Sequence, residues 1–247
     1  MKARERQRLK KDEVAETLQD VYQRVAQYRS RIVTAIAAAV ILVLAVGGWM
    51  WYRSNQTARA GAMLAEALVI SEAQVVAPAA PAEGQPPAPQ PPNTYPTEQA
   101  KLEAALPKFL AAADAYPSTP AGIAARYHAA TTLAALGRAD EARTQYQTVI
   151  DRSGRGLYGR MARLGLAELD MQAGRHDDAI AVLHELSLDV KGDLPVDAVL
   201  VQLGDAYLAA GKKAEAQQAF QRVTTEFADS PYATEAQQRL DALKAGA

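Results

Sequence analysis

The first long pattern of apolar positions is a run without any charged side chain, from Ile32 to Trp51. A helix of this length, at about 1.5 Å rise per residue, spans roughly 30 Å, the hydrocarbon thickness of a bilayer. Tryptophans close the run, as in the aromatic belt at a membrane interface. The pattern predicts a transmembrane helix over residues 32–52, with Ile32, Leu42, Trp49 and Trp51 as anchor residues.

Two other structures can produce an apolar run near the start of a chain, namely the buried core helix of a soluble protein and a cleaved signal peptide. The apolar part of a signal peptide is about 7–15 residues long and ends at a small-x-small cleavage site. This run is longer and ends in aromatic residues. We therefore expect a membrane anchor that stays on the protein.

Before the apolar run, apolar residues recur alternately every four and three positions, as the a and d positions of a coiled coil do. These residues are Val14, Leu18, Val21, Val25 and Tyr28. One interpretation is a short coiled coil that makes a homo-oligomer or docks on a partner. The other is an amphipathic helix that rests on anionic lipid. The sequence leaves both open.

The second half of the chain repeats a short phrase three times at an interval of 37 residues. Each copy begins with glycine and ends with alanine, and the copies lie at 137–142, 174–179 and 211–216. Glycine tolerates the left-handed conformation at a helix C-terminus, and the acidic residues that follow favour the first turn of the next helix. A fixed period of this size predicts stacked helix–turn–helix units that share one core.

Large apolar residues elsewhere keep the same step, as Tyr146, Leu183 and Phe220 do. Stepping back once from Tyr146 reaches Phe109, so a partial unit precedes the complete ones. A last helix is expected to cap the array and shield its final pair. The period predicts three full units and this capping helix, at about residues 123–159, 160–196, 197–232 and 233–244.

The third unit, with Gly204 and Tyr207 in its first helix and Ala216 and Phe220 in its second, resembles the tetratricopeptide repeat. The family's period is about 34 residues rather than 37, and the second unit has Asp170 where a tyrosine is usual. The resemblance implies an all-α fold. In it, one transmembrane helix is followed by a tetratricopeptide-like solenoid of period 37, within residues 98–247.

In tetratricopeptide proteins the first helix of each unit lines a concave wall that binds partners. The resemblance therefore implies a protein-binding groove. It does not imply the family's carboxylate clamp, because the lysine and asparagine of that clamp are missing from the matching positions. The residues expected to line the groove are Tyr127, Thr131, Met161, Leu164, Glu168, Met171, Val201, Asp205 and Leu208. Packing against the neighbouring helix is the alternative role for several of them.

Two segments join the apolar run to the repeats. Residues 53–77 are expected to continue as helix, and residues 78–97 hold eight prolines, which favours an extended spacer. Residues 98–115 are predicted to be the second helix of the partial unit, paired with the helix within 53–77. Pro107 is expected to kink this helix or to mark its true start. Outside the apolar run, no segment of the chain is expected to be a strand.

Net charge and cysteine content narrow the classes of partner. The chain of 247 residues has a net charge of −1, so it offers no broad basic field and nucleic acid is not an expected partner. The absence of cysteine excludes disulfides and thiolate metal sites. Residues 1–31 carry nine lysines and arginines and residues 52–77 carry two. The tail is therefore expected in the cytoplasm and the repeat domain in a bacterial periplasm.

The sequence contains no recognisable catalytic constellation. The histidines, His128, His176 and His184, do not have metal-ligand spacing on one helical face. A phosphate-binding loop, a serine elbow and a dinucleotide fingerprint are all missing. We therefore expect no enzyme activity, no cofactor and no metal.

The order of parts, with the segment Gly-Trp-Met-Trp-Tyr-Arg-Ser-Asn-Gln at 48–56 and the Ala-rich helix after it, resembles the ancillary Sec translocon subunit family. These are single-pass inner-membrane proteins with a periplasmic tetratricopeptide-like domain, and the Pro-rich segment is a departure from their pattern. The resemblance implies a membrane-anchored scaffold that assists protein export or periplasmic chaperone networks, with the Sec translocon or a periplasmic chaperone as partner. The alternative is an oligomeric scaffold for envelope division or outer-membrane assembly.

Overall fold

The computed structural model describes residues 2–78, 89–189 and 192–245, and side chains for Arg31 and from Val33 onward within these ranges. These residues are mainly helical, as an all-α fold requires. The chain divides into two compact units, residues 1–55 and 56–247. The all-α fold class is confirmed.

Helix α1 (Lys2–Ser71) provides all the described secondary structure of the first unit and the start of the second. Residues from Val33 to Tyr52 are exposed along its surface and are mostly large and apolar. The helix ends at Ser71, short of the predicted residue 77, where the amide of Glu72 still donates to the carbonyl of Leu68 at 2.9 Å. The chain leaves the helix there because the next residues pair as a strand.

A two-residue parallel ladder follows α1, which is a feature that the sequence did not predict. Strand β1 (Gln74–Val75) pairs with β2 (Thr94–Tyr95), and the amide of Val76 donates to the carbonyl of Tyr95 at 2.9 Å. A parallel pair needs a long connection, and the Pro-rich segment supplies it. Half of that predicted spacer, residues 79–88, lies outside the described residues.

Helix α2 (Glu98–Ala115) begins at Thr97, whose hydroxyl accepts a hydrogen bond from the amide of Ala100 at 3.1 Å. Pro107 lies inside the helix, so the expectation that it marks the true start is wrong. The last part of α1 lies against α2, because Lys108 forms an ion pair with Glu66 at 2.6 Å and Ala67 belongs to the same buried cluster as Phe109.

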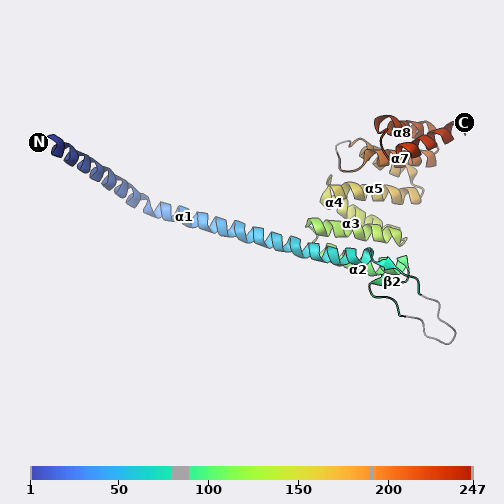
Figure 1. Cartoon of the computed structure of the whole chain (residues 1–247), viewed down its shortest axis with the longest axis horizontal. Helices are drawn as coiled ribbons and strands as arrows, with labels where there is room; N and C mark the ends of the chain where they lie inside the picture. Colours follow the sequence, from blue (N-terminus) through green and yellow to red (C-terminus); the bar gives the residue numbers. More distant parts are fainter. Residues whose placement is uncertain (1, 79–88, 190–191, 246–247) are drawn as a thin grey trace. The chain divides into compact units, whose positions relative to one another are not determined.

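The remaining helices are joined by short connections, and each packs against the next along the chain (Figure 1). The glycine-containing turns separate α3 from α4, α5 from α6 and α7 from α8. The helices are α3 (Pro120–Ala135), α4 (Ala139–Ser153), α5 (Leu157–Gln172), α6 (His176–Ser187), α7 (Val196–Ala209), α8 (Lys213–Glu226) and α9 (Ala233–Ala245).

The repeated glycines explain why the turns are alike. Gly137, Gly174 and Gly211 have φ angles of 73°, 74° and 75°, in the left-handed region. In each turn the residue after glycine donates its amide to a carbonyl five positions earlier, for example Arg175 to Asp170 at 2.8 Å. This is the Schellman end of a helix, in which a left-handed residue lets the last carbonyls find donors.

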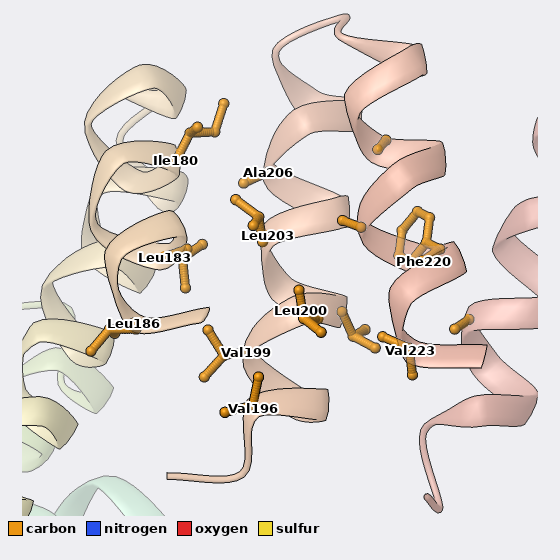
Figure 2. Close-up of a cluster of buried hydrophobic side chains, with 14 of the residues drawn as sticks. Ile180, Leu183, Leu186, Val196, Val199, Leu200, Leu203, Ala206, Phe220 and Val223 are labelled. Atoms are coloured by element: carbon orange, nitrogen blue, oxygen red, sulfur yellow. The ribbon is translucent and has the colours of Figure 1, made fainter. Parts of the chain in front are cut away.

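Two buried clusters hold the second unit together, and α5 contributes to both. Ala162 and Leu169 belong to the cluster that runs from the end of α1 to α5, whereas Ala167 belongs to the one that runs from α5 to α9. Figure 2 shows the second cluster, with side chains of α6, α7 and α8 directed toward one another. Phe220 packs so closely on α7 that a Cβ at Gly204 would lie 2.5 Å from its ring.

Candidate functional site

The residues predicted to line a groove lie on the first helices of the three pairs, α3, α5 and α7. Their exposure differs. Glu168 is exposed, whereas Val201 is only 6% exposed and belongs to the buried cluster, so its side chain packs in the core rather than facing a partner. Five of the others are partly buried hydrophobic or polar positions that keep some surface, namely Tyr127, Thr131, Met161, Asp205 and Leu208. Leu164 and Met171 are also partly buried, and together with Leu208 they pack against the core cluster.

A cavity of about 230 Å³ lies between α3 and α5, and two predicted groove residues, Thr131 and Glu168, line it. We call it the α3–α5 cavity. Its other walls come from the ends of both helices and from one residue of α4. These residues are Ala134, Ala135, Tyr146, Gly165, Leu169 and Gln172.

Tyrosine side chains pack beside this cavity. The Tyr127 ring lies 6.0 Å from Tyr146 and 5.6 Å from Tyr158, between centroids. Burial raises the pKa of Tyr127 and of Tyr146, and the nearby Glu168 carboxylate contributes to both increases. These phenols therefore keep their protons at neutral pH and add hydroxyl groups but no charge to the site.

Sequence reasoning missed Tyr146 and Gln172, which line the α3–α5 cavity. Tyr146 was assigned only to the repeated core position, and its ring does pack on Gly165, where a Cβ would lie 2.4 Å from it. It comes from a second helix, whereas the expected wall included first helices only. The packing of a large side chain on a glycine gave no signal for this role, because Phe220 packs on Gly204 in the same way and is fully buried.

Asp205, the predicted groove residue of α7, interacts with the capping helix. The Nε atom of Arg239 on α9 lies 3.5 Å from its Oδ1 atom. Burial raises the pKa of Asp205, while the Arg239 charge opposes that shift. In the last unit, the groove carboxylate of Asp205 is therefore paired with Arg239 of the same chain.

A second cavity, of about 320 Å³, lies between the start of α5 and the end of α6. Arg155, Arg160 and Arg163 line it, together with Glu185 and Asp189. Arg163 pairs with Glu185 at 2.9 Å, and Arg160 pairs with Asp189 at 3.3 Å. The carboxylates thus neutralise most of its positive charge, and we regard these contacts as links between helices.

None of the three histidine side chains lines the α3–α5 cavity. His128 stacks on Phe109 with ring centroids 5.3 Å apart, and burial lowers its pKa. His176 and His184 both lie on α6. Within residues 2–78, 89–189 and 192–245, no group of three or more His, Asp or Glu side chains could hold a metal ion.

The predicted membrane segment is helical, and its described anchor residues Leu42, Trp49 and Trp51 are exposed. Arg53 lies over the Trp49 ring at 5.4 Å. The part of α1 from Val33 onward is long and apolar enough to cross a membrane. The side chains of Ile32 and of the predicted tail stripe (Val14, Leu18, Val21, Val25 and Tyr28) lie outside the described residues, although their backbone is helical.

Comparisons with known proteins agree with the repeat fold. A family model described as a tetratricopeptide repeat-like domain matches residues 25–245. The structure of nearly identical TPR-like repeats of a Podosopora anserina kinesin light chain has a TM-score of 0.51 and 17% identity, and the match covers 58% of this chain and 77% of that one. No curated protein matches the chain.

A tetratricopeptide repeat protein from Parabacteroides merdae ATCC 43184 has a TM-score of 0.50 at 17% identity. The match covers 60% of this chain and 56% of that protein, so the chain spans little more than half of its length. At such identities the likeness to these structures shows the fold alone.

Proposed function

We propose, from the premise that the chain belongs to the tetratricopeptide repeat-like domain family, that it is a membrane-anchored scaffold that binds proteins in the groove of α3, α5 and α7. The family fold implies a protein-interaction scaffold. The observation that carries the proposal is the α3–α5 cavity, which opens on the helices that line the binding wall in such repeats.

The anchor in this proposal is the apolar part of α1. Its large side chains from Val33 to Tyr52 are exposed, and a bilayer would cover them. The excess of lysine and arginine in residues 1–31 supports a cytoplasmic tail. The second unit then lies in the periplasm of a bacterial inner-membrane protein.

We further propose that the partner is the Sec translocon or a periplasmic chaperone, so that the protein assists export. Support comes from the order of parts and from the segment 48–56 at the membrane exit. These features fit a membrane protein located beside the site where polypeptides cross the membrane.

Photo-crosslinking in living cells tests this proposal. A photoreactive amino acid at Gln172, which lines the α3–α5 cavity, should crosslink to translocon subunits or to an envelope chaperone. The matched control is the same amino acid at Gln218, an exposed position of α8 outside that cavity. Equal crosslinking at both positions, or capture of no envelope protein at Gln172, contradicts the proposal.

The second candidate function is an oligomeric scaffold for envelope division or outer-membrane assembly. It is favoured by the unbroken helix of α1 through residues 14–28, because a coiled coil requires this backbone. The molar mass of the full chain in detergent, measured by light scattering, tests whether the protein forms the oligomer that this second function requires. An oligomer that Leu18→Glu dissociates supports this function, and a monomer contradicts it.

A further inference from the structure

We propose that the α3–α5 cavity binds a lysine or arginine side chain of the partner polypeptide, with Glu168 as the counter-ion. This inference rests on the proposed function, because it assigns a partner chemistry to the same groove. Three observations carry it: the missing partner of Glu168, the charged pair at the matching position of the next unit, and the lining of the cavity.

The Glu168 carboxylate is exposed at the cavity and uncompensated. Among the described residues, it takes part in no hydrogen bond and no ion pair, whereas most other carboxylates of the repeat helices, such as Asp170 and Glu185, are paired. The described lining of the cavity includes no lysine or arginine. The site therefore carries one negative charge that the other described residues leave open to solvent.

The repeat itself shows what such a carboxylate pairs with. Asp205 lies 37 residues after Glu168, at the same position of the next unit, and Arg239 approaches it at 3.5 Å. The residue 37 positions before Arg239 is Gln202, which is exposed and neutral. Arg239 lies on α9, the helix after the α7–α8 pair, so the corresponding position for Glu168 is on α7 rather than on the α3 side where the cavity lies. The α7 position offers no cation, and we infer that a partner supplies one from the cavity side.

The cavity lining suits a long basic side chain rather than a small ion. Ala134, Ala135 and Leu169 provide apolar wall for an aliphatic stem, as such stems prefer. The volume of about 230 Å³ is many times the minimum of about 10–15 Å³ that one water molecule needs. The stem can therefore enter while the charged end reaches the polar groups.

Hydroxyl groups around Glu168 add acceptors for the charged end. Thr131 donates its proton to the carbonyl of His128 at 2.9 Å, which leaves its oxygen lone pairs free to accept. Tyr146 lines the same cavity as a neutral phenol, because burial raises its pKa. Lysine has three donors and arginine has five, so either side chain can use the carboxylate and these hydroxyls together.

Selection of peptides on the intact protein tests the inference without knowing the partner. The full chain in lipid nanodiscs is used to select binders from a random displayed peptide library. Each selected peptide is then labelled, and its affinity is measured by fluorescence anisotropy. We expect the selected peptides to share a lysine or arginine at one position, and replacement of that residue by norleucine to weaken binding about threefold to tenfold.

Variants of the protein identify the counter-ion. Glu168→Gln should weaken the binding of the basic peptides by the same factor and should leave the affinity for the norleucine peptide unchanged. Glu168→Lys should prefer a peptide with glutamate at that position, which a structural role of Glu168 would not produce. The matched control is Glu215→Gln, since Glu215 is an exposed carboxylate of α8 outside the cavity.

The outcomes separate this inference from the proposed function. Peptides that bind without a shared basic residue, or that bind Glu168→Gln as tightly as the natural protein, overturn the inference and leave a protein-binding groove in place. Failure to select any peptide contradicts both. Binding that depends on the basic residue but is lost equally in Glu215→Gln also overturns the role of Glu168.

Discussion

At the scale of single residues, the glycines that follow α3, α5 and α7 are among the positions where the backbone demands a particular residue type. Their φ angles of 73° to 75° place Cβ of any other residue close to the following carbonyl. The sequence predicted this role from the 37-residue step alone. It could do so because a left-handed helix end leaves a direct trace in residue type.

Gly174→Ala is therefore expected to lower the free energy of unfolding by about 1 kcal/mol. Urea unfolding of the full chain in detergent, followed by circular dichroism, measures the change. Gly61→Ala is the matched control, because Gly61 lies within α1 with nothing near its Cβ position, and alanine there should stabilise by up to about 1 kcal/mol. If Gly174→Ala leaves the free energy of unfolding unchanged or raises it, as Gly61→Ala is expected to do, the left-handed turn is contradicted.

His128 should make stability depend on pH. Burial lowers its pKa below the ordinary value of 6.5, and Glu72 opposes part of that shift. Between the lowered pKa and 6.5 the unfolded chain binds a proton that the folded chain does not, so folding stability is complete above 6.5 and falls as pH decreases through that window.

The free energy of unfolding measured from about pH 7.5 to about pH 5.5 should therefore fall more steeply for the natural protein than for His128→Gln. The difference between the two curves isolates this histidine from every other titrating group. Parallel curves would show that His128 is not desolvated in the folded state. A steeper fall in the variant would mean that the sign is wrong.

At the scale of elements, helices were predictable where the 37-residue step applied and less so where it did not. The start of α2 at Glu98 was predicted, but of the two roles expected for Pro107, a kink or the true start of the helix, the second is wrong. The ladder of β1 and β2 escaped prediction because two residues are too few to show the alternation of a strand. The partner strand also lies across the Pro-rich segment, which no local pattern connects to α1.

Asp170 shows what a departure from the repeat pattern means at this scale. It stands where a tyrosine is usual, and the sequence offered no reason. In the structure its carboxylate accepts hydrogen bonds from Arg143 of α4 at 2.6 Å and from Arg175, in the turn before α6, at 2.9 Å. Asp170 is buried at 6% exposure, so one carboxylate joins three successive elements.

Asp170→Ala should lower the free energy of unfolding by about 1–3 kcal/mol, because two charge-assisted hydrogen bonds of a buried acceptor are lost together. Urea unfolding measures it. Glu141→Gln is the matched control, since Glu141 pairs with Arg138 on the surface in the first turn of α4 and its loss should lower stability by less than Asp170→Ala does. If Asp170→Ala behaves like Glu141→Gln, the three-element link contributes no more to stability than a surface pair.

At the scale of the whole molecule, the groove was only partly predictable because its cavity arises from packing between units. Thr131 and Glu168 were identified by their position on first helices, and both line the α3–α5 cavity. Val201 was assigned by the same rule and is buried, because the rule gives a helix face without the depth of each residue. Tyr146 was assigned to the core, although it both packs on Gly165 and lines the α3–α5 cavity.

The same scale carries the prediction on which the proposed function depends, that α1 crosses a membrane once with the repeats outside the cytoplasm. Nine basic residues before the span against two after it favour this orientation over its inverse. Protease added to intact spheroplasts should digest the second unit, residues 56–247, and spare an epitope placed on the tail. After lysis, the tail epitope should be digested as well, which controls for intrinsic resistance. A protected second unit with a digested tail would place the groove in the cytoplasm, beyond the reach of periplasmic partners, and the export proposal would fail with it.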